Sequence, residues 1–357
     1  MQHPPGEDAA IEALRGFAAL IVVASHYAYL VVKTPGPWGF ATTGVDLFFV
    51  LSGFVFAPYL AERRLEWLPH LARRFFRLYP LYLVALLAYV ALKLPSPDAG
   101  KHFVEHLFMA HTLRSLDIAF YYNAAFWSLP PEVEFYLLLP LVAGVLRGRG
   151  FGLFVAFALA MHMALVALAV PGEGVTPRAI ATVHLPGVLI EFCLGAWAAR
   201  IAQSRGARGS RLARGMSGLA VLVAMAVLFT LYVADPKEAA TTTPWLTGNV
   251  GLGAAFGYAL VVSALAGGAQ PKGIALSLCL LAGQLSYGIY LFHNAMPQVL
   301  SRTSLDIGGW GAVFVCLAAT LVVAWLLHHA VEAPARNYGR ALSARWRGQP
   351  AATNVSP

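Results

Sequence analysis

The feature that most constrains this chain is a series of long apolar runs that follow one another along almost its whole length. They lie near residues 10–33, 40–61, 75–94, 132–147, 150–170, 180–203, 215–234, 248–268, 274–300 and 308–331. A helix needs about 20 mostly apolar residues to cross the hydrocarbon core of a bilayer. The runs therefore predict an all-α, polytopic bundle of about ten transmembrane helices, of which the fourth is short.

The composition supports a membrane protein over a soluble one. Of the 357 residues, 59% are hydrophobic and only 12% are charged, whereas about 25% of the residues of a soluble domain are charged. So few charged residues cannot cover the surface of a soluble protein of 357 residues. No soluble domain is visible, so we expect one transmembrane domain over 1–340 and a disordered cytoplasmic tail over 341–357.

The basic residues predict the orientation of the spans. The chain has 25 lysines and arginines and a net charge of +8. Membrane proteins concentrate such residues in their cytoplasmic loops, and no basic patch interleaved with aromatic residues points to nucleic acid. Along the predicted spans, 18 basic residues fall on one side and 7 on the other. We therefore expect both termini in the cytoplasm and no nucleic-acid partner.

One segment between the third and fourth runs is neither a span nor an ordinary loop. Residues 102–115 are too few to cross a bilayer and contain three histidines, so we predict a re-entrant or interfacial helix. The three cysteines each lie in an apolar stretch and are predicted to be core residues. No metal-binding spacing such as HExxH occurs, so we expect no metal site.

Ionisable residues inside predicted spans are the candidates for function, because burying them in the bilayer is costly. Arg15 and His26 lie in the first span with ten residues between them. Eleven steps of about 100° return nearly to the same helical face, with a rise of roughly 16 Å. We therefore place Arg15 at the cytoplasmic end and His26 beyond the midplane. The alternative is a histidine that only hydrogen-bonds a neighbouring helix.

Three more polar groups are expected at the depth of His26, in the outer half of the bilayer. Asp46 lies about six residues into the second span, and a carboxylate facing His26 would fix its tautomer and raise its basicity. Pro130 and Pro131 suit the first turn of a helix and would place Glu132 near the outer mouth. His293 lies in the outer half of the ninth span. The alternative is a set of interhelical contacts without chemistry.

A second cluster is expected at the inner face. Arg73, Arg74 and Arg77 begin the third span, and guanidinium groups bind phosphate oxygens in a bidentate manner. We interpret them as a phosphate clamp, with the alternative that they are only a signal for topology. Glu332 is expected to pair with one of them.

Taken together, these motifs resemble the membrane-bound acyltransferase family 3. The matching pieces run in family order over nearly the whole chain: Arg15-x10-His26, GVDLFFVLSGF at 44–54, RRFFRLYPLY at 73–82, WSLPPEVEFY at 127–136, SYGIYLFH at 286–293, and Glu332-x-Pro334. One departure is the pair Pro130-Pro131, where the family has small residues before the glutamate. The appended hydrolase-like domain of some members is not seen here.

The resemblance implies an O-acyltransferase of the inner (plasma) membrane. Its donor would be cytoplasmic acetyl-CoA or another acyl-CoA, with phosphates held by Arg15, Arg74 and Arg77. Its acceptor would be a hydroxyl of a cell-surface glycan or glycolipid. His26 would act as general base or carry the acyl group, and Asp46 would orient it. Glu132 and His293 would hold the acceptor or shuttle a proton.

Two other functions remain open from the sequence. The first is acylation of a small molecule, such as an antibiotic, in place of a glycan. The second is a transporter that uses the same buried histidines and carboxylates as a proton relay. A transporter of this kind is typically built from inverted repeats with paired broken helices, and neither pattern is visible in the sequence.

Overall fold

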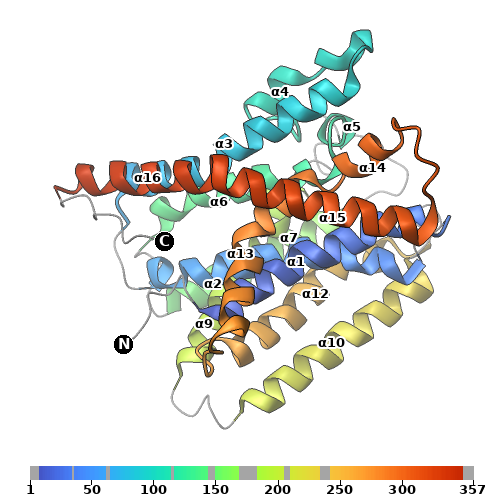
Figure 1. Ribbon diagram of the computed structural model, residues 1–357. Coiled ribbons are helices and arrows are strands. Elements are labelled where there is room, and N and C mark those ends of the chain that lie inside the picture. Colours follow the sequence, from blue (N-terminus) through green and yellow to red (C-terminus); the bar gives the residue numbers. More distant parts are fainter. Residues whose placement is uncertain are drawn as a thin grey trace.

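The computed structural model describes residues 8–33, 36–61, 65–113, 116–143, 149–168, 183–204, 210–233 and 242–348, and within these ranges it contains helices and no strands. The longer helices are α1 (Ala9–Tyr27), α2 (Gly44–Ala61), α3 (Trp67–Lys93), α6 (Leu129–Val142), α7 (Arg149–Ala167), α9 (Leu185–Gln203), α10 (Arg211–Tyr232), α12 (Pro244–Leu265), α13 (Ile274–Phe292), α15 (Gly309–Leu327) and α16 (Ala333–Trp346). Short helices are α4 (Phe103–Leu107), α5 (Leu116–Ala119) and α14 (Ala295–Leu300). The predicted polytopic helical bundle is confirmed (Figure 1).

The number of full-length spans differs from the prediction. Nine helices within the described ranges are long and apolar enough to cross a membrane, one fewer than the ten expected. The missing one is the run near 132–147, which forms only the 14 residues of α6. Such a helix is about 21 Å long, whereas the hydrocarbon core is about 30 Å thick. The prediction of ten complete spans is wrong at this position.

A 3₁₀-helix before α6 explains why a short α-helix is tolerated there. It is η4 (Ala124–Ser128), and α6 follows it directly, with Pro130 and Pro131 in its first turn. Phe126 of η4 is fully enclosed. Departures from the α-helix are tolerated at membrane depth where protein covers them. Further along α6, the ring Nε2 of His70 on α3 donates to the Tyr136 carbonyl at 3.2 Å, which fixes α6 against the start of α3.

Part of the segment 102–115, predicted to be a re-entrant or interfacial helix, forms the short helix α4, while residues 114 and 115 lie outside the described residues. Its place relative to the membrane stays a prediction. Helix α4 folds back along α3, and the hydroxyls of Tyr79 and Tyr82 donate to the carbonyls of Leu107 and His106, at 2.8 and 2.6 Å. The rings of His106 and His111 stack with their centroids 4.3 Å apart. Burial lowers the pKa of His106 to about 4 and that of His111 to about 3. Both histidines are therefore neutral and serve the packing of this loop.

Close helix pairs are made where glycines meet backbone. On α2 and α9, Gly53 lies against the Phe192 carbonyl and Gly195 lies against the Val50 carbonyl, so a β-carbon at either glycine would collide with main chain. Small residues of this kind let membrane helices approach closely. This contact places α2 and α9 side by side at the centre of the bundle.

A second close pair joins α1 to α13, which run in the same direction. In the first half of α1, Gly16 lies against Ala282 and Glu12 lies against Gly283, both midway along α13. Where the two helices end, the side chains of His26 and His293 touch. Two residues far apart in the chain are therefore brought to the same depth by one helix pair.

The C-terminal part of the described chain differs from the expected tail. Helix α15 continues through a π-helical turn, η5 (His328–Glu332), into α16, which ends at Trp346. The Ser343 hydroxyl donates to the Pro69 carbonyl at 2.8 Å. The expected boundary at 340 is therefore wrong, because α16 extends past it and packs on α3. The remainder of the expected tail, from 349 on, lies outside the described residues.

The start of α1 and the end of α16 lie at the same end of the bundle, at the left of Figure 1. There, Asp8 accepts from the Gly267 amide at 2.7 Å, and Arg347 pairs with Glu66 at 2.5 Å. This agrees with an even number of chain crossings if the short α6 is counted with the nine long helices. That this end faces the cytoplasm stays a prediction from the basic residues.

The α2–α9 crossing gives a test of the fold. We expect Gly195→Ala to lower the melting temperature of the purified protein in detergent, because the new methyl group collides with the Val50 carbonyl. Overpacking of this kind costs about 1–3 kcal/mol. The matched control is Gly152→Ala on α7, where nothing lies within 4 Å of an added β-carbon and alanine raises helix propensity. Equal melting temperatures for the two variants would contradict the close crossing.

Candidate active site

The site begins with a cavity lined by residues of α1, α2, α3, α6 and α13. It has a volume of about 730 Å³, its open mouth included. The apolar part of its wall comes largely from α2. Its polar lining residues are Arg15, Ser52, Arg74, Arg77, Ser128, Glu132, Tyr136, Ser286, Tyr287 and Tyr290.

The three arginines predicted to bind phosphate all line this cavity. Arg74 and Arg77 lie three residues apart on α3 and therefore share one helical face. The guanidinium of Arg74 lies over the rings of Phe56 and Tyr136, at 4.9 and 5.5 Å from their centroids. That of Arg15 pairs with Glu12 at 2.5 Å. The cavity is thus lined by several cations whose side chains are already oriented.

Glu132 lies in this cavity and not at the outer mouth, where the sequence had placed it. Its Oε1 accepts from the Ser52 hydroxyl at 3.2 Å and from the Tyr136 hydroxyl one helical turn away. It is also one of the carboxylates whose field acts on Arg77. The depth prediction fails because α6 is short and begins inside the bundle, so Glu132 joins the arginines and not the histidines.

The two predicted histidines form a pair. Nε2 of His293 and Nδ1 of His26 are 2.9 Å apart, and their ring centroids are 4.9 Å apart. His26 is at the end of α1 and remains partly exposed, whereas His293 follows the last residue of α13 and is fully buried. The predicted meeting of His26 and His293 at one depth is therefore found in the structure.

The hydrogen bonds of His293 decide which nitrogens of the pair carry protons. Its Nδ1 lies 2.8 Å from the Tyr290 carbonyl and 3.2 Å from the Ile289 carbonyl. Carbonyl oxygens only accept, so Nδ1 carries the proton and Nε2 of a neutral His293 has a lone pair. Nδ1 of His26 must then donate to it. A neutral His26 therefore keeps the lone pair of its Nε2 for another group.

The backbone around His293 is held by side chains from three other elements. The Tyr27 hydroxyl donates to the His293 carbonyl at 2.8 Å. The Tyr89 hydroxyl and the Asn123 amide each donate to the Leu291 carbonyl at 3.0 Å. These carbonyls lie at the end of α13, where the helix itself no longer supplies partners, and the His293 carbonyl also accepts from the Met296 amide at 3.3 Å. The bonds therefore satisfy them and fix the position of the His293 ring.

Asp46 is not the partner of His26, contrary to the prediction. Its carboxyl group hydrogen-bonds the carboxyl group of Glu191 on α9. Such a bond needs a proton on one of the two groups. Asp46 starts α2 on the face toward α9 and α12, where its Oδ1 lies against Gly251. The arrangement differs from the prediction because equal depth does not determine which way a residue faces around its helix.

The cavity and the histidine pair are adjacent and not merged. Tyr290 lines the cavity, and its ring centroid lies 6.1 Å from that of His293. The Tyr290 hydroxyl bonds Ser128 at 2.7 Å. Among the described residues, neither histidine lines the cavity. The site therefore has a positively charged inner part and a histidine pair, with Tyr290 between them.

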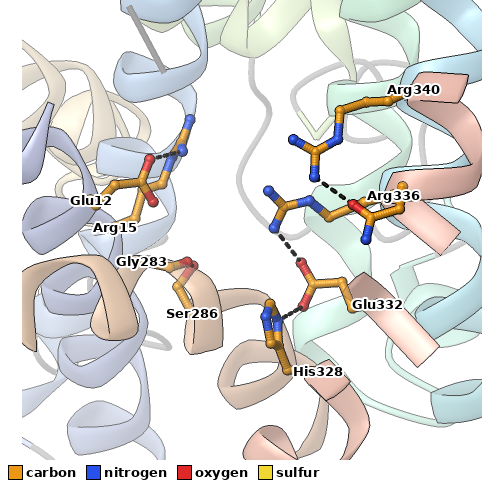
Figure 2. A network of polar contacts seen from close by, with 9 residues as sticks. Glu12, Arg15, Gly283, Ser286, His328, Glu332, Arg336 and Arg340 are labelled. Carbon is orange, nitrogen blue, oxygen red and sulfur yellow. Dashed lines mark hydrogen bonds and ion pairs between the residues drawn. The ribbon is translucent and has the colours of Figure 1, made fainter. Parts of the chain in front are cut away.

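A further group of charged residues lies where the cavity approaches α16 (Figure 2). Glu332 bonds Nδ1 of His328 at 3.0 Å and pairs with Arg336 at 3.6 Å. The expected partner on α3 is therefore replaced by one on α16, although the field of Glu332 also acts on Arg77. Across from them, Glu12 and Arg15 project from α1.

Sequence reasoning missed several of the polar residues that complete the site. Ser52, Tyr136 and Tyr290 stand inside the motifs that carried the prediction, but only their neighbours were singled out. Tyr136 lies four residues after Glu132 on the same helix, and this spacing alone indicates that its hydroxyl can reach the Glu132 carboxylate. Arg336 was counted only as a basic residue of the cytoplasmic side, and nothing in its spacing pointed to the cavity.

Comparison with known proteins agrees with the resemblance noted from the motifs. A family model described as an acyltransferase domain matches residues 8–329. The chain is 26% identical over 308 residues to "Putative acetyltransferase ORF330" of Acidianus two-tailed virus, covering 84% of this chain and 87% of the relative. No solved structure matches.

A second relative is more similar over a shorter stretch. "Protein 2 in picA locus" of Rhizobium radiobacter is 37% identical over 112 residues, which cover 28% of this chain and 57% of the relative. The family match extends over both the cavity and the histidine pair. The chain belongs to the membrane-bound acyltransferase family 3, and the protein is a multi-pass membrane acyltransferase.

Proposed function

We propose that the protein moves an acetyl group from cytoplasmic acetyl-CoA to a hydroxyl of a cell-surface glycan or glycolipid, and that it does so in the inner (plasma) membrane. The family supports acyl transfer, and the name of the viral relative supports acetyl as the group. The positively charged cavity suits a donor with several phosphates. The partly exposed His26 suits an acceptor that approaches from the other side.

The observation that carries the proposal is the proton arrangement of the histidine pair. Since His26 donates through Nδ1 to His293, its Nε2 is the nitrogen that accepts a proton from the acceptor hydroxyl. The hydroxyl oxygen attacks the thioester carbon, the C–S bond breaks, and the CoA thiolate leaves. His26 returns the proton to that thiolate. His293 stabilises the charged His26 and keeps its ring in place.

The donor would lie along α1. Its phosphates would contact Arg15, Arg74 and Arg77, which line the cavity. The pantetheine arm would then extend past Tyr290 toward His26, since Arg15 and His26 are about 16 Å apart along one helical face. Glu132, held by Ser52 and Tyr136, would set the conformation of the cavity wall and limit its net charge.

The first prediction concerns the base. We expect His26→Gln to lower the rate of acetyl transfer by about 10²- to 10⁴-fold, the usual contribution of general base catalysis, while acetyl-CoA binding stays unchanged. The control is His329→Gln, which alters an exposed histidine bonded to the Trp325 carbonyl. Transfer is followed by mass spectrometry of envelope glycans and by release of free CoA. Near-normal turnover in a folded His26→Gln protein would exclude His26 as the base.

The second prediction separates the roles of the two histidines. We expect His293→Gln to retain more activity than His26→Gln, because a glutamine amide oxygen still accepts the proton of His26 Nδ1. His293→Leu removes that acceptor and should be the more damaging of the two substitutions. Rates measured at saturating acetyl-CoA make the comparison. If His293→Gln were as inactive as His26→Gln, the assignment of base and positioning residue would have to be revised.

The third prediction concerns the donor phosphates. We expect Arg74→Gln and Arg77→Gln each to weaken acetyl-CoA binding by about 10- to 100-fold, as expected for a lost hydrogen bond between charged groups. Lysine at either position should restore only part of the affinity, because it lacks the planar guanidinium fork. Isothermal titration calorimetry with the purified protein measures the acetyl-CoA affinity of the glutamine and the lysine variants. If the double variant R74Q/R77Q binds acetyl-CoA with unchanged affinity, the arginine cluster serves only as a signal for membrane topology.

A further inference from the structure

Two arginines of α16 stand beside the site without a role in the function proposed so far. Figure 2 shows Arg336 and Arg340 reaching from α16 toward the space in front of Arg15 on α1. Arg336 lies within electrostatic range of Arg15 and Arg77, both of which line the cavity. Neither α16 arginine lines the cavity itself. They therefore extend its positive charge outward, on the side away from the histidine pair.

The fold holds this face of α16 in a defined position. The π-helical turn η5 joins α15 to α16 and buries Glu332, and turns of this kind often occur at functional sites. Further along, Gly339 packs directly on Phe76 of α3, and the buried Ser343 bonds the Pro69 carbonyl. Residues 332, 336, 339 and 343 lie on one helical face. Arg336 is therefore directed toward the cavity by helix packing.

The charges of this region do not balance. Arg15, Arg74, Arg77, Arg336 and Arg340 contribute five positive charges. The carboxylates among them are Glu12, Glu132 and Glu332. Glu12 pairs with Arg15, Glu332 is shared by Arg336 and His328, and Glu132 accepts bonds from Ser52 and Tyr136. Guanidinium groups that repel one another at short range are stabilised by a bound polyanion.

We propose that Arg336 and Arg340 bind the 3′-phosphate of the CoA ribose, as a second phosphate subsite beyond the one at Arg74 and Arg77. This inference rests on the proposed function. It follows from position, because the 3′-phosphate is carried on the nucleotide end of CoA, opposite the thioester. Arg336 and Arg340 likewise lie at the end of the site opposite His26. The exposed Arg340 can follow the ligand, since its hydrogen-bond partner among the described residues is the neighbouring Asn337.

The subsite also assigns a role to Glu332. Its carboxylate pairs with Arg336 at 3.6 Å. A phosphate offers the same guanidinium a stronger bidentate partner. Glu332 therefore keeps Arg336 directed toward the cavity until the donor arrives, and it remains bonded to His328 afterwards.

The test compares two ligands that differ only in this phosphate: acetyl-CoA and acetyl-3′-dephospho-CoA, titrated into the purified full-length protein. We expect the wild type to prefer acetyl-CoA by about 10- to 100-fold. Arg340→Gln and the double variant E332Q/R336Q should bring that preference close to one while leaving the Kd for the dephospho ligand unchanged. The double variant removes both members of the pair between the buried Glu332 and the partly exposed Arg336, so no unpaired carboxylate remains to destabilise the fold.

The matched control is Arg347→Gln, which removes an arginine directly after α16 that pairs with Glu66 at the surface; it should keep the wild-type preference. Full preference in Arg340→Gln and E332Q/R336Q would overturn the inference and leave these arginines as topology signals. If the variants weaken the binding of both ligands equally, the inference is also overturned, because the substitutions then act through overall charge or folding. If the wild-type protein binds acetyl-CoA and acetyl-3′-dephospho-CoA equally well, the subsite is refuted but the proposed function is not. If the wild-type protein binds neither ligand, the proposed function is refuted as well.

Discussion

The parallel contact between α1 and α13 is the constraint on which the rest of the site depends. Gly16 against Ala282 and Gly283 against Glu12 let the two backbones approach closely midway along α13. Where the two helices end, this closeness leaves His26 and His293 within hydrogen-bond distance. Helices in a bilayer gain little from hydrophobic burial against each other, so such steric fit determines which pairs form. A larger residue at either glycine would separate the imidazoles as well as the helices.

The same helix pair explains how one chain keeps two kinds of chemistry apart. Arg15 sits near the start of α1, with the arginines of α3 and α16 around it, and His26 sits at its end. Buried charge is stable in a membrane only where it is paired or hydrogen-bonded. Here Glu12, Glu132 and Glu332 each have a partner, and the two histidines hydrogen-bond each other. Phosphate binding and proton transfer are therefore separated along one helix by about 16 Å.

Much of this could be predicted from the sequence, and the errors share one physical origin. The long apolar runs determined the helical membrane fold, and the cost of burying charge identified Arg15, His26 and His293. Depth, however, was inferred by counting residues along ideal spans. Helix α6 breaks that rule, because a 3₁₀-helix replaces part of the α-helical span, and Glu132 consequently lies among the arginines. Asp46 was placed at a suitable depth but on a face directed to Glu191.

By itself, the sequence determined which residues must leave water and which of them are too polar to do so without partners. Hydropathy and residue type are local properties, so the fold class and most candidate residues follow from them. Only the tertiary structure decided which partners those residues have: His293 for His26, Glu191 for Asp46, Arg336 for Glu332. Each pairing depends on the rotation of one helix against another. That rotation is set by close packing at glycines and by hydrogen bonds between segments far apart in the chain.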